Sequence, residues 1–233
     1  MNIRLAAVLV SIVLLSSCTG EDEPLNTYIE DPPPDPSVRW VTLSSGKTLR
    51  GIWFDCDGTA YAVGDEGSAF YYGGEGWQPV PAGTSSRLND IWGDGNGKLY
   101  AVGEAGTVAE YDGRWSIRST PVSTGLNAVW GSSSSNIFAV GGSGKIIRYN
   151  GSRWVEMDSG TTIDLNDIYG RSGTDIYAVG NRGTLLHFNG DQWRRIPSPY
   201  TAWFTAVWVA QAGDVYVGGL AGFLLHYSEG EWT

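Results

Sequence analysis

Short apolar runs separated by turn residues follow one another along most of the chain, and they repeat. The run Ile-Tyr-Ala-Val-Gly at 176–180 has counterparts that carry a tyrosine or phenylalanine at the same place: Tyr61, Tyr100, Phe138, Tyr177 and Tyr216. These aromatic residues lie 39, 38, 39 and 39 residues apart. A fixed period of this size indicates a repeat architecture in which each copy is one supersecondary unit.

Each unit contains four apolar runs. The first begins with a large apolar residue and has an aromatic residue four positions later, and the second ends in Gly-x-x-Gly. The third ends in an aromatic residue, and a tryptophan after an Asn/Asp/Gly turn opens the fourth. Runs this short, rich in β-branched and aromatic residues, predict strands. Two glycines around two residues suit a tight turn in which φ is positive or a Cβ would clash.

Four short antiparallel strands in about 39 residues are typical of a β-propeller blade. We therefore predict an all-β fold, with a single propeller of five four-stranded blades over residues 40–233. Trp40–Gly46 matches the fourth run Trp154–Gly160, so the N-terminal strand is expected to complete the last blade and close the ring. Trp40 and Trp232 then compete for one place. The alternative is an open arc of five units completed by a second molecule.

In such a meander, the turn after the second strand and the connection into the next unit emerge at the same end. The connection Ser198–Trp203 differs from the others because Tyr200 and Trp203 lie outside every aromatic position of the repeat. Exposed aromatic residues beside Arg182 and Asn181 have the composition of a binding hot spot. We predict a ligand site at Tyr200, Trp203, Arg182 and Asn181. The alternative is that Tyr200 and Trp203 only fold over the rim of the last blade.

Residues 1–17 have the composition of a lipoprotein signal peptide. Arg4 supplies a positive charge, and the apolar run Leu5–Leu15 is about half as long as a membrane-spanning helix. The sequence Leu-Ser-Ser-Cys at 15–18 resembles the bacterial lipobox, which implies cleavage before Cys18 and acylation of its sulfur. An uncleaved anchor or a buried helix is the alternative. With Cys18 assigned to lipid, only Cys56 is left, and we expect no intrachain disulfide.

Residues 18–39 form an acidic, proline-rich linker. The prolines at 32–34 and 36 favour an extended spacer. Thr19 stands where an inner-membrane retention signal would have aspartate, so the resemblance to lipoproteins implies a lipid-anchored envelope protein at the outer membrane. Acidic residues at 21–23 resemble a surface-export signal. Whether the domain faces the periplasm or the exterior stays open.

The formal net charge of the chain is −10, from 25 acidic and 15 basic residues. Residues 1–39 contain six acids and two bases, so 19 acids and 13 bases remain, a net charge of −6 on residues 40–233. A net acidic domain without a lysine or arginine cluster argues against nucleic-acid binding and against electrostatic adhesion to anionic lipid.

The segment Gly183–Trp193 resembles a degenerate Asp-box (BNR-type) repeat, in which Tyr/Phe-Asn/Asp-Gly-x-x-Trp replaces the usual Ser-x-Asp-x-Gly-x-x-Trp. The Ala-Val-Gly-x-x-Gly-Thr core resembles the photosystem II assembly-factor propellers. The resemblance covers residues 40–233 and implies a propeller. It implies no activity, because Asp-box propellers include sialidases, assembly factors and binding proteins.

Catalytic residues do not stand out. A sialidase needs three clustered arginines, but the arginines here lie at different places in the repeat. His187 and His226 share one repeat position with Arg148, which indicates strand-face residues rather than a catalytic base or a metal pair. We predict no catalytic residue, no metal and no cofactor. In place of an active site, we expect a binding site on the loop face.

We therefore predict a non-catalytic binding or scaffold lipoprotein that presents this face to a protein, peptide or glycan. A five-bladed lectin is one alternative, and it would need near-identical pockets in units whose loops in fact differ. An Asp-box glycosidase-like enzyme is the other alternative.

The lipobox yields the first testable prediction. Replacing Cys18 with serine removes the sulfur that would carry the acyl chains, so the variant is expected to lose detergent-phase partitioning completely, because two or three acyl chains are what hold a lipoprotein firmly in a bilayer. Phase separation of wild type and Cys18→Ser measures this. If both proteins stay in the aqueous phase, the lipoprotein prediction is wrong.

Overall fold

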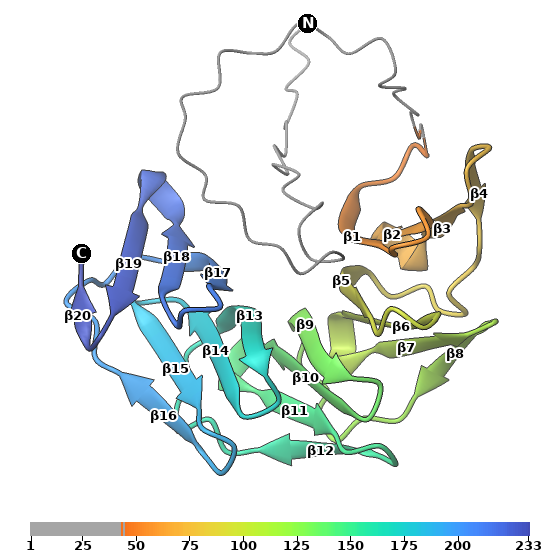
Figure 1. Cartoon of the computed structure of the whole chain (residues 1–233). Helices are drawn as coiled ribbons and strands as arrows, with labels where there is room; N and C mark the ends of the chain where they lie inside the picture. The colour runs from red at the N-terminus through yellow and green to blue at the C-terminus, as the bar shows by residue number, and fades with distance from the viewer. Residues whose placement is uncertain (1–42, 44) are drawn as a thin grey trace, which may run out of the picture. The chain divides into compact units, whose positions relative to one another are not determined.

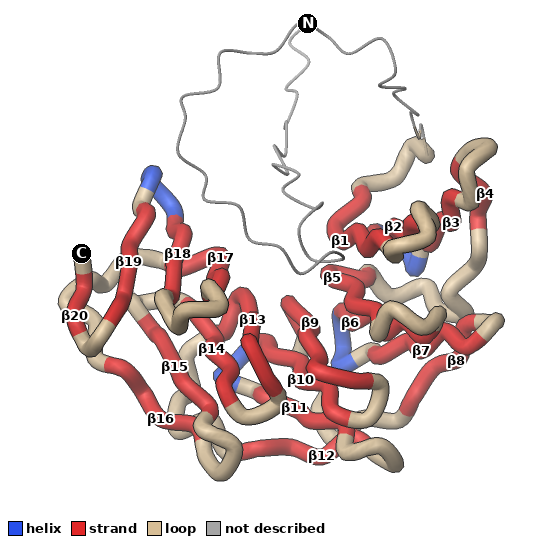
Figure 2. Tube along the Cα trace, in the orientation of Figure 1, coloured by secondary structure: helices blue, strands red, loops and turns tan. Residues whose placement is uncertain are grey.

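Five antiparallel sheets of four strands each make up the computed structural model of the chain (Figures 1 and 2), which describes Leu43 and residues 45–233. Consecutive strands pair within every sheet, so each sheet is a meander, and the predicted five-bladed β-propeller is confirmed. Cys18, the linker and Trp40 lie outside the described residues. No helix among the residues described is long and apolar enough to cross a membrane.

The blades are numbered in chain order. Their strands are β1 (Leu49–Phe54), β2 (Ala60–Gly64), β3 (Ala69–Tyr72) and β4 (Trp77–Pro79) in blade 1; β5 (Leu88–Gly93), β6 (Lys98–Gly103), β7 (Val108–Asp112) and β8 (Trp115–Arg118) in blade 2; β9 (Leu126–Ser133), β10 (Asn136–Gly141), β11 (Ile146–Tyr149) and β12 (Trp154–Met157) in blade 3; β13 (Leu165–Ser172), β14 (Asp175–Gly180), β15 (Thr184–Phe188) and β16 (Trp193–Ile196) in blade 4; and β17 (Phe204–Val209), β18 (Val215–Gly219), β19 (Leu224–Ser228) and β20 (Glu231–Trp232) in blade 5.

Successive blades pack face to face, as the aromatic repeat predicts. We call the sheet face turned to the next blade the forward face; in blade 3 it includes Trp130, Phe138, Val140 and Ile146. The backward face of blade 4 covers it with Ile168, Ile176, Ala178, Leu186 and Phe188. The same kind of junction joins blades 1 and 2, 2 and 3, and 4 and 5. The first strands β1, β5, β9, β13 and β17 lie side by side in that order.

Tryptophan packs on glycine at three of these four junctions. A Cβ on Gly93 would lie 2.4 Å from Nε1 of Trp53, one on Gly131 would lie 2.8 Å from the ring of Trp92, and one on Gly170 would lie 2.9 Å from the ring of Trp130. The fourth junction pairs a smaller ring with a larger neighbour: Tyr169 of blade 4 packs in the cluster that contains the buried Val209 of blade 5. The volume of the aromatic residue and that of its neighbour therefore compensate each other.

Asparagine side chains bind successive blades together at the start of the first strands. The Nδ2 atoms of Asn89, Asn127 and Asn166 each donate a hydrogen bond of 2.7 Å to a backbone carbonyl of the following blade. The three acceptors are the first residues of the following blades' first strands: Leu126, Leu165 and Phe204.

Two aspartates bind neighbouring blades in a second way. Asp90 accepts hydrogen bonds from the backbone N–H of Ile91 in its own strand, at 2.8 Å, and of Val129 in blade 3, at 2.9 Å. Asp167 accepts in the same way from Ile168, at 2.8 Å, and from Val207 in blade 5, at 2.7 Å. Burial raises the pKa of Asp90 to about 6 and that of Asp167 to about 7, although these N–H donors favour the charged form.

The last blade has its own fourth strand. β20 pairs with β19, and Trp232 takes the place of Trp193 and its equivalents: its ring centroid lies 5.0 Å from that of Tyr227, and its Nε1 donates to the carbonyl of Pro197 at 2.8 Å. Of the two tryptophans expected to compete for the start of the fourth strand in blade 5, Trp232 takes that position. Closure of the ring by the strand from Trp40 onward lies outside the described residues and stays a prediction.

The expectation for Cys56 is wrong. Cys56 is disulfide-bonded, and its partner lies outside the described residues. A sulfur atom that carries a thioether-linked lipid cannot also form a disulfide, so the bond of Cys56 bears on the lipid prediction.

The two buried aspartates make stability depend on pH. The ordinary aspartate pKa is 3.8, so between about pH 4 and pH 7 the folded protein holds protons that the unfolded chain has released. The free energy of unfolding should therefore fall as pH rises through this window, by roughly 3 kcal/mol per carboxylate, and level off above about pH 7.

Urea unfolding curves from pH 4 to pH 8 measure this slope. The double variant Asp90→Asn/Asp167→Asn does not titrate, so most of the decline should disappear. Each asparagine keeps one of the two accepting oxygens and loses the other, so the variant should also be less stable than wild type at every pH. Asp191→Asn, at an exposed turn, is the control and should keep it. An unchanged slope in the double variant would contradict the assignment.

Candidate functional site

The turns between the second and third strands lie together at one end of the sheets, beside the start of the first strands. The first residue of each turn donates its N–H, at 2.9–3.0 Å, to the carbonyl of the residue before the first strand of the same blade. The donors are Asp65, Glu104, Gly142, Asn181 and Leu220, and their acceptors are Thr48, Arg87, Gly125, Asp164 and Trp203. We call this end the turn face; Figure 2 marks four of the turns in blue. The prediction that these turns and the connections between blades share one face is confirmed.

Each turn requires glycine at two positions, for different reasons. In blade 4, Gly180 is extended, but a Cβ there would lie 2.1 Å from the carbonyl oxygen of Asp164. Gly183 has a φ of +65°, and a Cβ on it would lie 1.8 Å from the carbonyl oxygen of Tyr200. Arg182 between them has a φ of 55°, the left-handed region that is uncommon outside glycine. The turn therefore holds Arg182 outward while its backbone touches the connection that carries Tyr200.

The structure brings the four predicted site residues to this face, in two neighbouring places. The turn with Asn181 and Arg182 packs on the connection with Tyr200, since Gly183 N–H donates to Ala202 O at 2.7 Å. Trp203 is 55% exposed, and its carbonyl accepts from Leu220 N–H at 3.0 Å. Tyr200 is half-buried and packs against the core between blades 4 and 5. The burial of Tyr200 therefore favours the alternative in which it packs over the rim of the last blade, whereas the side chain of Trp203 is exposed.

Asn181 has a structural bond of its own. Its Oδ1 accepts from Nδ2 of Asn166 at 2.9 Å, and Asn166 is one of the residues that bind blade 4 to blade 5. The side chain of Asn181 is therefore part of the scaffold beneath the site, and Arg182 is the exposed polar residue beside it.

Two further residues extend the predicted site. Leu220 is 52% exposed in the last turn, and Phe223, 39% exposed, has its ring centroid 6.0 Å from that of Tyr200. Tyr200, Trp203, Leu220 and Phe223 form what we call the apolar patch. Other blades have polar or small residues at three of these four places: the equivalents of Trp203 are Thr48, Arg87, Gly125 and Asp164; those of Leu220 are Asp65, Glu104, Gly142 and Asn181; those of Phe223 are Ser68, Thr107, Lys145 and Thr184. Leu220 and Phe223 depart from the repeat in the sequence itself, and this departure could have identified them as candidate site residues.

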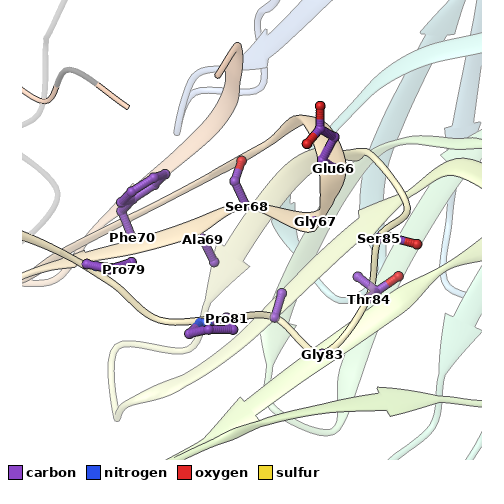
Figure 3. Close-up of a pocket in the computed structure, with 11 residues that line it drawn as sticks. Glu66, Gly67, Ser68, Ala69, Phe70, Pro79, Pro81, Gly83, Thr84 and Ser85 are labelled. Carbon is purple, nitrogen blue, oxygen red and sulfur yellow. The ribbon is translucent and has the colours of Figure 1, made fainter. Parts of the chain in front are cut away.

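A pocket of about 550 Å³ lies at the turn face of blade 1 (Figure 3). Phe70 and Pro79 line one end, and Thr84 and Ser85 line the other. Thr84 holds the repeat position of Tyr200, and its carbonyl touches the turn glycine Gly67 as that of Tyr200 touches Gly183. Glu66 at this pocket already forms an ion pair with Lys47.

The two histidines belong to separate blades, as predicted, and each is held by its own strand neighbours. His187 Nε2 lies 2.7 Å from Oδ1 of Asp175, and its ring stacks on Tyr177 with centroids 4.4 Å apart. His226 Nε2 lies 3.2 Å from Asp214 and its ring stacks on Tyr216. Within residues 45–233, no group of three or more His, Cys, Asp or Glu could hold a metal ion.

No protein-family model and no curated protein matches the chain. Among solved structures, it is similar to virginiamycin B lyase from Staphylococcus aureus, with a TM-score of 0.71 and 11% identity over 79% of this chain and 68% of that one. A streptogramin B lyase gives 0.73 and 13% over 82% and 70%, and YCF48 bound to D1 peptide gives 0.61 and 17% over 84% and 66%. YCF48 is a photosystem II assembly factor, so the predicted similarity to those propellers is confirmed for the fold. Identities this low show the fold alone.

Burial separates the roles of the two predicted aromatic residues. Tyr200→Ala should lower the free energy of unfolding by roughly 1–3 kcal/mol, because Tyr200 packs against the core and Phe223. Trp203→Ala, at an exposed side chain, should change it by less than about 0.5 kcal/mol. Denaturant unfolding of both variants measures the difference. Equal losses of stability would mean that Trp203 is also part of the rim packing.

Proposed function

We propose that this protein is a non-catalytic binding protein of the bacterial envelope and that the apolar patch binds an apolar segment of a protein or peptide. We also propose that lipid on Cys18 holds the protein at the outer membrane, which requires that this sulfur forms no disulfide with Cys56 in the anchored protein. The observation that carries the proposal is the patch itself. Trp203, Leu220 and Phe223 are exposed at positions where the other blades have polar or small residues. Exposed apolar clusters on otherwise soluble surfaces mark interaction sites.

The composition of the patch favours a protein segment over a glycan. Leu220 and Phe223 have no hydrogen-bonding group in their side chains, and a sugar needs donors and acceptors for its hydroxyls beside any aromatic ring that it stacks on. A propeller lectin would repeat its pocket in each blade, whereas these residues occur in blade 5 alone among the described blades. The same fold carries a peptide in YCF48 bound to D1 peptide, which is consistent with this choice.

Arg182 extends the patch with a positive charge. Its side chain is exposed in the turn next to Tyr200, so a partner with an acidic residue beside its apolar segment would gain an ion pair at the rim. Rim charges of this kind change the association rate and its salt dependence more than the final affinity.

The absence of catalysis belongs to the proposal too. His187 and His226 are the chain's two histidines, and each stacks on a tyrosine and pairs with an aspartate, which is the first residue of β14 for His187 and directly precedes β18 for His226. Both therefore have a structural explanation.

Lipid attachment also has a direct test. The intact mass of the membrane-extracted protein without reductant distinguishes a thioether-linked diacylglycerol on Cys18 from a disulfide at that sulfur, because each changes the mass differently.

A peptide library displayed on phage or on an array tests the binding proposal. Peptides selected by the wild-type domain should contain apolar runs, and Trp203→Ala and Leu220→Ala should each weaken their binding about tenfold or more, as expected for central interface residues. Ile117→Ala is the matched control, because Ile117 is 47% exposed on β8 of blade 2 and should have no effect.

Three outcomes would contradict the proposal. Selected peptides that bind Trp203→Ala and wild type equally would place the site elsewhere on the molecule. Selection of no peptide, together with binding to a glycan array, would favour the lectin. Equal weakening by Ile117→Ala would mean that the measured binding is nonspecific.

A further inference from the structure

A second set of exposed apolar residues follows the repeat instead of departing from it. On the forward face of blade 5, Leu224 is 75% and Trp208 52% exposed. The residues equivalent to Leu224 in blades 1–4 are at most 3% exposed: Ala69, Val108, Ile146 and Leu185. On the backward face of blade 1, Ile52 is 39% and Phe54 40% exposed, whereas the equivalents of Ile52 in the other blades are at most 6% exposed. These two faces belong to the first and last sheets of the row (Figure 1) and have the composition of a junction without its other half.

The turn of blade 5 shows the same unfilled junction. In blades 1–4, a Cβ on the second turn glycine would lie 1.8–2.2 Å from a carbonyl oxygen of the connection into the next blade. At Gly222, the equivalent residue of blade 5, no atom of the described residues lies within 4 Å of that position. The forward side of blade 5 is therefore open from its turn to its sheet face.

The two open faces do not fit each other. Trp208 has the position of Trp53, Trp92 and Trp130, each of which packs on a glycine of the next blade. The residue that blade 1 offers at that position is Phe54. A phenylalanine ring at Phe54 would occupy the space that Trp208 needs. The junction of blades 4 and 5 supports this, because Val209 stands there at the glycine position and the smaller Tyr169 stands at the tryptophan position.

The buried aspartates give an independent reason. Asp90 and Asp167 together accept the N–H groups of Ile91, Val129, Ile168 and Val207, which hold one repeat position in blades 2–5. Ile52 holds that position in blade 1. A junction of blade 5 with blade 1 would offer Ile52 no carboxylate, because the two residues at the aspartate position are Gly51 and Ala206.

We infer that the forward face of blade 5 docks a further four-stranded unit of this repeat, one with glycine where blade 1 has Phe54. Its backward face would cover Trp208, Tyr216 and Leu224 as blade 4 covers blade 3. The five copies in the sequence are all used in blades 1–5, and residues 1–39 contain no other copy, so the docked unit lies outside these 233 residues.

A fusion tests this inference. The fusion joins a copy of residues 156–193 directly after Thr233. Trp232 and Thr233 then precede the copy as Trp154 and Val155 precede residue 156 in the natural chain. The copy has glycine, from Gly170, at the position where blade 1 has Phe54. The control is the same fusion with Phe in place of that glycine. Acrylamide quenching of Trp208, obtained by subtracting the Trp208→Phe variant of each protein, reports how well the face is covered, and light scattering gives the mass.

The glycine fusion should lower the quenching constant of Trp208 at least threefold and raise the melting temperature by several degrees, and the phenylalanine fusion should do neither. Leu224→Glu should leave the unfused chain unchanged, since this side chain is exposed, and should abolish the gain in the glycine fusion. Leu224→Glu thus also reports on a fusion that folds poorly, because it would then change nothing.

Four results would overturn the inference. One is equal protection of Trp208 in the two fusions, and another is no protection in either. A third is an unfused monomer in which Trp208 is already protected, which would show that the ring closes on itself despite Phe54. The last is an unfused oligomer that protects Trp208, which would show that a second copy docks there.

Discussion

A four-stranded sheet of this length cannot bury both of its faces, so every blade depends on the junction with its neighbours. The central contact of that junction is a tryptophan on a glycine, as for Trp92 on Gly131. Burial of an aromatic side chain removes about 150–250 Å² from water, and the missing Cβ lets the two sheets approach closely enough for it. The asparagine bonds at the strand starts and the shared aspartates depend on that approach, because their acceptors and donors belong to the next blade. Apolar packing sets the distance between blades, and the polar bonds fix their register.

The aspartates show how a repeat protein can use residues that are not repeated. One carboxylate has enough acceptor sites for two N–H groups, so Asp90 serves its own blade and blade 3, and blade 3 has Ala128 at the same position. Two carboxylates on adjacent blades would place buried charges near each other. Burial is the main cause of the raised Asp167 pKa, and the charge of Asp90 two blades away raises it further. The alternation along blades 2–5 thus limits the number of buried charges while it satisfies the buried donors.

The sequence was sufficient for the fold because the period, the strand positions and the two glycines of each turn are local signals that five copies reinforce. Trp92 and Tyr100 were recognisable as core residues from their recurrence alone. The junctions were harder to predict. Nothing in the spacing shows that the Asn89 side chain reaches the carbonyl of Leu126, which lies in the next blade and is 37 residues away. The place of Trp232 depended on pairing between strands that compete for one edge, and no repeat position marks Cys56 as disulfide-bonded. Tyr200 and Trp203 stood out because they broke the pattern. Leu220 and Phe223 broke it too, but they stand at turn positions, where apolar residues attract less notice than an aromatic pair.

Blade 5 carries both kinds of exposed apolar residue, and its geometry relates them. In the earlier blades, the connection into the next blade lies on the turn glycine, as that of Tyr200 lies on Gly183. A unit docked on blade 5 would enter through a connection lying on Gly222, between Leu220 and Phe223. It would therefore border the apolar patch in the way that Tyr200 borders Arg182. A ligand on the patch and a unit on the forward face would then share a boundary at this turn, so each would change the binding free energy of the other by the same amount.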